Sequence, residues 1–214
     1  AQEALCTSSS RESAEMPDSI LYHDGNRTLQ DAFDSRRMAD RMEEKITRRE
    51  FSESDREFIE STIYFFLASA DAEGRPDCSF KGGPAGFVRV TAPGELAFPD
   101  YDGNGMFKSL GNLSVNPNVG LLFIDMHGKP RRLRVNGVAT VQRNDELLAA
   151  SVGAQLIVRV AVRVIFPNCP RYIPKMQLVE ASPFTPQPGQ PGVEPDWKTS
   201  DSFRDVVPRR PDTT

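Results

Sequence analysis

The chain has 214 residues, a net charge of −4 and a hydrophobic share of 38%, which is enough for one domain with a hydrophobic core and polar tails. A mildly acidic chain is a poor general binder of nucleic acid, because contacts to phosphates need a basic surface. No apolar run approaches the ~18 residues of a membrane span, so we expect no membrane partner.

The three cysteines, Cys6, Cys78 and Cys169, are widely spaced and form no Cys-x-x-Cys pair. This spacing argues against a disulfide framework and a structural zinc site, and it favours a reducing compartment. The N-terminal residues lack the apolar stretch of a secretory signal. We therefore expect a cytoplasmic protein.

The N-terminal quarter of the chain is polar with helical patterning. Residues 1–18 are rich in serine, and we expect them to be disordered or loosely packed. Apolar residues at helical spacing predict a helix over Leu29–Ile46. Ser52 followed by Asp55 resembles a helix start and predicts a second, short helix that ends near Ser61.

From Ile63 onward the texture is that of short strands separated by turns. We expect strands at Ile63–Ser69, Cys78–Gly82, Gly86–Thr91, Glu95–Pro99, Val119–Ile124, Arg132–Gln142 and Gln155–Phe166. Short helices are expected over Met106–Leu113 and Asp145–Ser151. Strands at this spacing predict a mainly β fold, an antiparallel barrel or sandwich with flanking helices.

The C-terminal tail is rich in proline from Pro183 onward, which is typical of an extended arm. The expected organisation is therefore an N-terminal segment over residues 1–18, a barrel domain over 19–182 and an arm over 183–214.

The segment Lys81-Gly-Gly-Pro-Ala-Gly86 is a candidate phosphate site. Glycines after a strand let backbone N–H groups approach an anion, and a lysine supplies charge. The segment is neither a Walker loop nor a dinucleotide fingerprint, because no Lys-Ser/Thr ends it and no βαβ unit follows. An ordinary glycine turn is the alternative.

The segment Asp100–Gly105 resembles the first half of a calcium loop. The twelfth position would be Gly111 instead of the required Glu, so we expect no metal site. A tight turn that leads into a helix is favoured. Asn104, Ser109 and Asn112 then surround the start of that helix, where an anion is favoured, although ordinary capping explains the same pattern.

Two further groups of residues have ambiguous patterns. Arg132 and Arg134 would share one face of a strand, either as a ligand-facing pair or as a solvated edge. The two histidines, His23 and His127, are far apart and neither has a metal-like neighbour.

The segment Phe65–Val90 resembles the opening hairpin of the pyridoxamine 5′-phosphate oxidase-like, FMN-binding split-barrel superfamily. Leu96–Leu113 with Asn116-Pro117 resembles the next strand and helix of that superfamily. The segments that fit a bacterial and fungal subgroup are Arg132–Gly137, Phe166–Ile173, Tyr22-His23 and Leu29–Phe33.

This resemblance implies a six-stranded antiparallel split barrel that forms a homodimer, with FMN in a groove at the dimer interface. It implies that the flavin is lined by Ser79, Phe80, Lys81 and Gly82, with Asp100 and Tyr101 near its ring or ribityl chain. Asn104, Ser109 and Asn112 would approach the phosphate with Lys81. Arg134 and the segment Cys169–Tyr172 would come from the partner subunit.

The sequence also departs from the pyridoxamine phosphate oxidases themselves. Cys78-Ser-Phe-Lys81 stands where they carry an Arg-rich pattern, and the tail offers Asp196-Trp197-Lys198 without a histidine. We therefore expect an FMN-dependent oxidoreductase whose small-molecule substrate or electron donor is not pyridoxamine phosphate. Tyr101 and Arg134 are candidates for polarising that substrate, and the sequence names no general base.

Two other classes of protein are alternatives. The first is a non-catalytic flavin or haem carrier on the same barrel. The second is a nucleic-acid-binding β-barrel, which the acidic balance opposes. Phe65, Phe66 and Phe98 also fall in apolar strand runs, which predicts core positions instead of a stacking platform.

Overall fold

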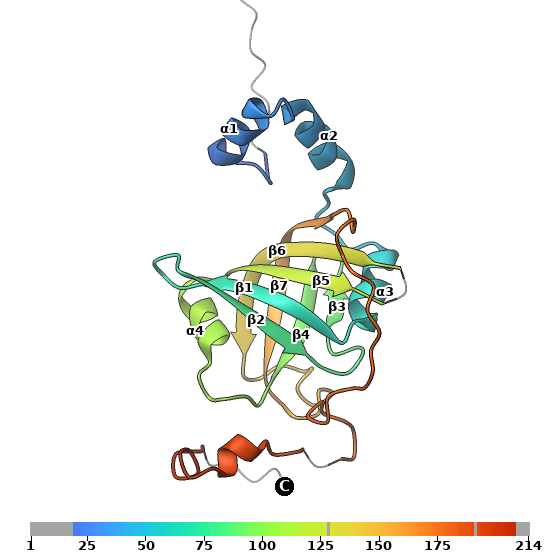
Figure 1. The fold of residues 1–214 in the computed structure, drawn as a ribbon. Helices are drawn as coiled ribbons and strands as arrows, with labels where there is room; N and C mark the ends of the chain where they lie inside the picture. The colour runs from blue at the N-terminus through green and yellow to red at the C-terminus, as the bar shows by residue number, and fades with distance from the viewer. Residues whose placement is uncertain (1–18, 128, 191, 209–214) are drawn as a thin grey trace, which may run out of the picture. The chain divides into compact units, whose positions relative to one another are not determined.

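The structure, a computed structural model, describes residues 19–127, 129–190 and 192–208. The chain divides between Lys45 and Ile46 into an N-terminal unit and a larger barrel unit (Figure 1). The expected disorder of residues 1–18 lies outside the described residues. The boundaries expected at residues 18/19 and 182/183 stay predictions.

The N-terminal unit contains two helices, α1 (Asp24–Ala32) and α2 (Arg36–Ile46), so the single helix predicted over Leu29–Ile46 is wrong. α1 ends because Asp34 takes the left-handed conformation, with φ of 50°. The Ser35 N–H donates to the Gln30 carbonyl at 2.8 Å, and the Asp34 N–H donates to the Asp31 carbonyl at 3.2 Å. This is a Schellman ending with aspartate in place of the usual glycine.

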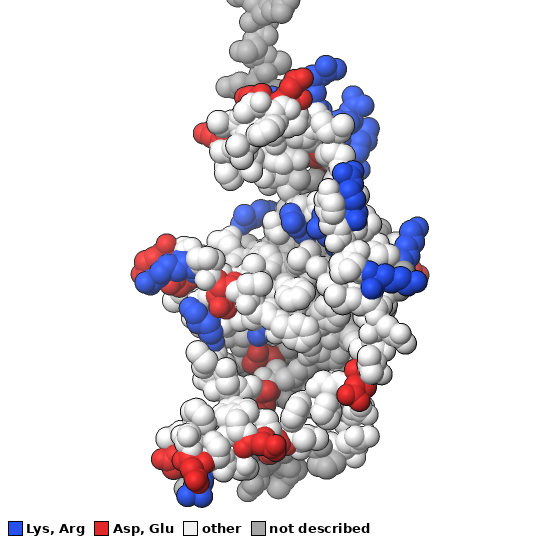
Figure 2. Space-filling model, in the orientation of Figure 1, with Lys and Arg blue, Asp and Glu red and all other residues white. Residues whose placement is uncertain are grey.

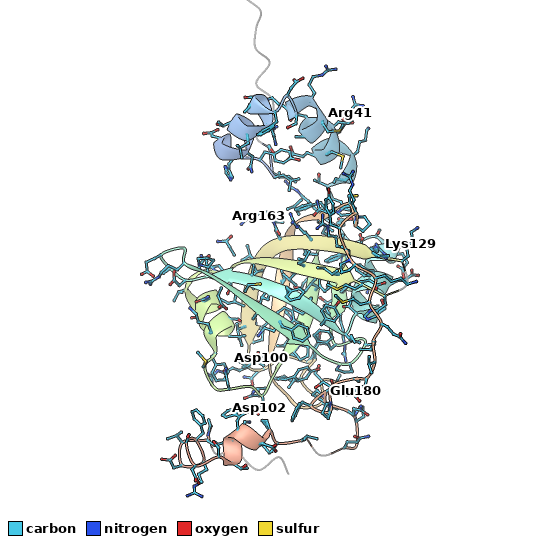
Figure 3. The ribbon with its side chains drawn as sticks, viewed as in Figure 1. Arg41, Asp100, Asp102, Lys129, Arg163 and Glu180 are labelled. Carbon is cyan, nitrogen blue, oxygen red and sulfur yellow. The ribbon has the colours of Figure 1, made fainter. Side chains whose placement is uncertain are left out.

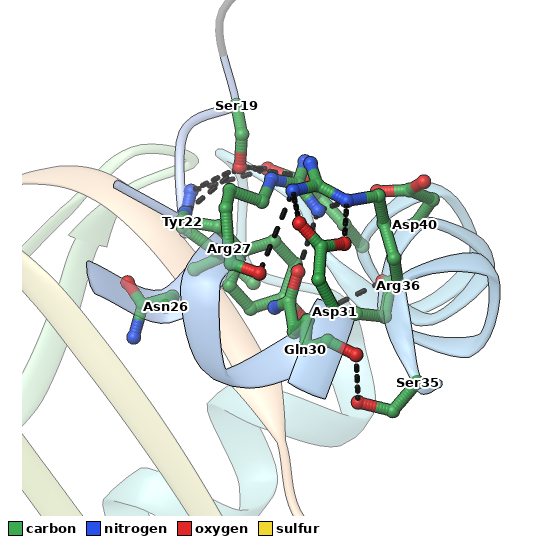
Figure 4. A network of polar contacts seen from close by, with 12 residues as sticks. Ser19, Tyr22, Asn26, Arg27, Gln30, Asp31, Ser35, Arg36 and Asp40 are labelled. Carbon is green, nitrogen blue, oxygen red and sulfur yellow. Dashed lines mark hydrogen bonds and ion pairs between the residues drawn. The ribbon is translucent and has the colours of Figure 1, made fainter. Parts of the chain in front are cut away.

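Polar contacts hold the N-terminal unit together (Figure 4). Arg27 of α1 donates to Asp40 of α2 at 2.6 Å, and Arg36 donates to Asp31 at 2.6 Å. No described residue of α1 or α2 is buried. The unit therefore owes its form to caps and ion pairs instead of to a core of its own.

The barrel unit is built on one antiparallel sheet with the strand order β2-β1-β5-β6-β7-β4-β3 (Figure 1). Its strands are β1 (Tyr64–Ala70), β2 (Pro76–Gly82), β3 (Arg89–Ala92), β4 (Glu95–Tyr101), β5 (Asn118–Asp125), β6 (Arg131–Gln142) and β7 (Ala154–Pro167). The predicted mainly β class is confirmed. The sheet has seven strands where the resemblance implied six, because the short β3 pairs with β4.

Alternation along the strands places the core inside the curved sheet. Phe65 of β1 is fully buried, and its ring centroid lies 4.9 Å from that of Phe98 and 5.2 Å from that of Phe123. Each such burial contributes roughly 1.5–3 kcal/mol. Phe65 and Phe98 are thus confirmed as core residues, whereas Phe66 lies on the outward face and is partly exposed.

Two glycines meet steric demands of the sheet. Gly74 forms the predicted turn between β1 and β2 with φ of +80°, a conformation that L side chains rarely adopt. At Gly137 the register between β6 and β7 shifts, and a Cβ atom there would lie 2.3 Å from the Ala161 carbonyl oxygen. Only glycine allows the two strands to approach this closely.

Two helices accompany the sheet, α3 (Glu53–Ser61) and α4 (Lys108–Val115). The predicted start of α3 is confirmed, because the Ser52 side chain accepts from the Asp55 N–H and the Asp55 side chain accepts from the Ser52 N–H. A short 3-10 helix, η1, covers Asp196–Thr199. None of the described helices is long and apolar enough to cross a membrane.

The helix predicted over Asp145–Ser151 is wrong, because this segment forms successive turns. The Asp145 carboxylate accepts from the Leu147 N–H at 2.9 Å and from Arg159 of β7 at 2.6 Å. An aspartate that is held by a strand and by its own backbone favours a turn over a helix.

Candidate functional site

A cavity of about 1000 Å³ opens between β2, the loop that follows β4, the start of α4 and the C-terminal segment. Its lining includes residues 79–82, 99–110, 194, 197–198, 203 and 206–208. Figure 3 places Asp100 and Asp102 on the side of the barrel that faces the C-terminal segment. On the face drawn in Figure 2, acidic atoms are visible in the hollow beside that segment.

β2 lies at the edge of the sheet and supplies two polar side chains, Ser79 and Lys81, to the cavity. Ser79 and Lys81 pair with Leu67 and Phe65, whose side chains point into the barrel, so Ser79 and Lys81 share the inward face. The Ser79 Oγ lies 2.9 Å from the Ser109 Oγ of α4. This contact brings β2 and α4 together at the cavity wall.

Lys81 lies beside Asp100 of β4. The Lys81 Nζ is 3.7 Å from the Asp100 Oδ1, and both side chains are largely buried. Burial raises the pKa of Asp100, and the attraction of Lys81 only partly opposes this. An ammonium that is held by a single long contact remains available to an anion.

Asp102 lies two residues further along and forms an ion pair with Lys198 of η1. Lys198 is 7% exposed, and its Nζ lies 3.5 Å from the Glu194 Oε2. Between these acids, Tyr101 has its pKa raised to about 12 by burial, with Arg89 opposing the rise. The Tyr101 hydroxyl is protonated at neutral pH, as an ordinary tyrosine is, and burial keeps it so at higher pH; it can donate in a hydrogen bond.

The start of α4 has an unusual backbone. Phe107, the residue before the first helical turn, has φ of 48° and ψ of 29°, a left-handed conformation that is uncommon for a bulky residue. Its side chain makes no capping hydrogen bond. Strain of this kind persists where the surrounding structure enforces it, often at binding sites. The first residues of α4, Lys108–Leu110, line the cavity, and the N–H groups of a first helical turn are potential anion donors.

Eight of the ten residues expected at the site line this cavity: Ser79, Phe80, Lys81, Gly82, Asp100, Tyr101, Asn104 and Ser109. Asn112 of α4 does not line the cavity. Its side chain is buried and donates to the Ser69 Oγ of β1 at 3.0 Å. Arg134 does not line it either. It lies on β6, with its guanidinium 5.8 Å from the centre of the Phe166 ring.

The C-terminal contribution to the cavity was not predicted. Trp197, Lys198 and Phe203 line it, although the tail was expected to be an extended arm. One feature of the sequence could have indicated this contribution: the only tryptophan of the chain stands next to a lysine in that tail.

The described residues offer little to a metal ion. No three described His, Cys, Asp or Glu side chains are arranged to hold one. Neither histidine lines the cavity, because His23 caps α1 and the Nδ1 of His127 lies 3.5 Å from Asp125.

An antiparallel split barrel with a polar cavity beside its edge strand is the class that the fold defines. Residues 51–184 match the family model for pyridoxamine 5′-phosphate oxidase. This match covers more than half of the chain, and the protein therefore belongs to the pyridoxamine 5′-phosphate oxidase family. A search of curated proteins found no match.

Several solved structures are similar to this chain. A putative pyridoxamine 5′-phosphate oxidase from Lactobacillus delbrueckii is 21% identical, with 56% of this chain and 95% of that chain covered and a TM-score of 0.44. An FMN-binding protein from Syntrophomonas wolfei is 11% identical, with coverages of 66% and 97% and a TM-score of 0.44. HutZ, the heme storage protein from Vibrio cholerae, is 19% identical, with coverages of 55% and 95% and a TM-score of 0.40.

Proposed function

We propose that the cavity holds FMN and that the protein is an FMN-dependent oxidoreductase of its family. The observation that supports this most directly is the convergence of Lys81, the Ser79–Ser109 pair and the uncapped start of α4 on one cavity. Lysine, hydroxyl groups and helix N–H groups are the donors that bind a dianionic phosphate.

The cavity also suits the flavin in size and surface. Its volume of about 1000 Å³ lies at the upper end of the range for small-molecule sites. Aromatic side chains on its walls, among them Tyr101, Phe107 and Trp197, can pack against a planar ring. The acidic lining opposes an anion, but Lys198 already pairs with Asp102, which reduces this opposition.

The roles of the chain's own residues follow from their places. Lys81, Ser79 and Ser109 bind and orient the phosphate, while the protonated Tyr101 hydroxyl donates to the ring or to a bound substrate. Bound flavin would supply the two-electron chemistry. We assign no general base, and pyridoxamine phosphate is not the proposed substrate.

We also propose that two copies form the functional unit. The outward face of the sheet carries a cross-strand row that runs Phe80, Phe66, Leu122, Arg134 and Phe166. Phe80 is 62% exposed, and Phe66, Leu122 and Phe166 are partly exposed beside the exposed Arg134. A largely apolar face of this kind is suited to an interface. In such a dimer Arg134 lies on the contact face and can reach the partner's cavity.

A haem carrier is less well supported, because haem needs an axial ligand and neither histidine lines the cavity, which offers Tyr101 and Met106 in their place. A flavin carrier without catalysis remains the alternative, and it differs only in its response to an electron donor.

The test is the absorption spectrum of the purified protein, followed by mass spectrometry of the released ligand. We expect flavin bands that bleach when a reduced nicotinamide cofactor is added. Flavin bands that never bleach would favour the carrier. A Soret band, or no flavin uptake on titration with FMN, would show that the proposal is wrong.

A further inference from the structure

The C-terminal segment Glu194–Pro208, here called the strap, forms one wall of the cavity. Its apolar contribution comes from Trp197, Phe203 and Val206–Val207. Figure 1 draws the strap in red, outside the sheet. A ligand in this cavity would therefore lie between the barrel and a segment that belongs to no strand of it.

The strap has its own internal hydrogen bonds. The Lys198 N–H donates to the Pro195 carbonyl at 3.0 Å, and the Val206 N–H donates to the Phe203 carbonyl at 3.0 Å. Among the described residues, the backbone hydrogen bonds of the strap join residues within the strap. Such a segment can move as one piece without leaving buried backbone groups unsatisfied.

The apolar side chains of the strap are only partly covered. Trp197 is 40% exposed, Phe203 48% and Val206 66%. Partial burial stabilises a docked segment less than full burial does, because the hydrophobic contribution scales with the area removed from water. Polar contacts to the barrel then decide whether the strap stays docked.

Lys198 makes such a contact. It is the most buried residue of η1, and its ammonium forms an ion pair with Asp102 in the loop after β4. A lysine is rarely this buried unless it is paired. The pair joins the strap to the cavity rim, at a point 96 residues away in sequence.

We propose that the strap is a gate over the cavity and that the Lys198–Asp102 ion pair is the latch that keeps it closed. Ligand enters and leaves when the latch opens and the strap swings away. The gate rests on the proposed function in one respect: FMN is the ligand whose entry into the cavity and exit from it are measured. Asp102 is partly exposed although Lys198 is buried, so salt screens the pair only in part, and the gate opens somewhat more readily at ~1 M than at ~0.15 M ionic strength.

The latch can be measured without any ligand, because Trp197 is the only tryptophan in the chain and lies in the strap. Acrylamide quenching of its fluorescence reports how accessible the strap is. We expect stronger quenching in Lys198→Ala and Asp102→Asn than in the unmodified protein, and a loss of the salt dependence that we expect of the unmodified protein. Lys129→Ala, an exposed lysine outside the cavity, is the matched control and should change neither.

Passage through the gate is measured by stopped-flow mixing with FMN. Loss of the latch should raise both the association and the dissociation rate constants, the latter about tenfold, as expected for a charged hydrogen bond at a partly exposed site. A lost ligand contact would raise dissociation alone. The exchanged pair Lys198→Asp with Asp102→Lys should restore slow exchange.

Two results would overturn the gate: unchanged quenching in both latch variants, or faster dissociation with unchanged association. If the unmodified protein takes up no FMN, the proposed function is wrong. The quenching experiment alone then tests whether the Lys198–Asp102 ion pair keeps the strap closed. Circular dichroism establishes that each variant is folded.

Discussion

Asp55 and Asp100 are two largely buried carboxylates of the barrel unit whose pKa values move in opposite directions. Asp55 is fully buried and accepts from Arg48 at 2.6 and 2.8 Å and from the Ser52 N–H at 3.0 Å. Burial raises its pKa, but these hydrogen bonds outweigh the rise and lower it. Asp100 has Lys81 at 3.7 Å, and burial prevails, so its pKa is raised.

The difference lies in how completely each charge is paired. A carboxylate that is surrounded by well-placed donors is a structural element, because its ionised form is the stable one. A carboxylate that is desolvated at a cavity with one distant cation responds to whatever enters that cavity. Asp55 therefore stabilises the fold, whereas Asp100 lies where a ligand in the cavity would meet its charge.

The largest expected effect is that of Asp55 on the free energy of unfolding. Asp55→Asn keeps the shape of the side chain but removes the charge that Arg48 and Arg131 face. We expect a loss of about 3 kcal/mol in the free energy of unfolding, the usual cost of breaking a buried ion pair. Chemical denaturation measures it, and Glu53→Gln in the same helix turn is the exposed control. A loss no larger than that of the control would show that the pairing is dispensable.

The same residue predicts a pH dependence. Because folding lowers the pKa of Asp55, its contribution is fully present above the ordinary aspartate pKa and is lost as pH falls through the lowered value. The difference in stability between the unmodified protein and Asp55→Asn should therefore shrink below about pH 4. A difference that stays constant well below about pH 4 would contradict this assignment.

The second effect belongs to the cavity. Lys81→Ala removes the cation that faces the proposed phosphate, and FMN affinity should fall about ten- to hundredfold, as for a hydrogen bond to a charged group. Stability should change little, because the Lys81–Asp100 contact is long. Fluorescence titration measures the affinity, with Lys129→Ala as the control. Unchanged affinity would show that the phosphate lies elsewhere.

Much of the barrel follows from alternation in the sequence. Phe65 and Leu67 are buried and Phe66 is not, because successive strand residues face opposite sides. Local signals fail where a distant partner decides the structure. Asp145 reads as a helix start, but Arg159 draws it into a turn.

The site shows the same limit. Residues of β2 and of the segment after β4 carry recognisable patterns, and the structure gathers them around one cavity. The place of Lys198 at the cavity could not be predicted, because it depends on how a proline-rich tail docks on the barrel. The spacing of residues in the tail does not indicate this docking. The end of α1 at Asp34 was missed for a simpler reason, since no glycine or proline marks it.

A smaller effect separates charge from shape within the cavity. Asp100→Asn removes the negative charge beside Lys81 and should raise FMN affinity about threefold, since a like charge near an anion is unfavourable. Riboflavin, which lacks the phosphate, is the matched ligand and should bind equally to both proteins. An equal gain for riboflavin would place Asp100 at the ring instead of the phosphate.

The smallest expected effect tests whether α4 contributes a side chain as well as its N–H groups. Ser109 is buried and contacts Ser79 at 2.9 Å, whereas Ser114 of the same helix is exposed and donates to the Gly111 carbonyl at 2.7 Å. Ser109→Ala should weaken FMN binding about twofold, the lower end of the range for a neutral hydrogen bond. Ser114→Ala should leave binding unchanged while altering the helix to a similar degree. Equal losses in the two variants would mean that the stability of α4, and not a contact from Ser109, controls the affinity.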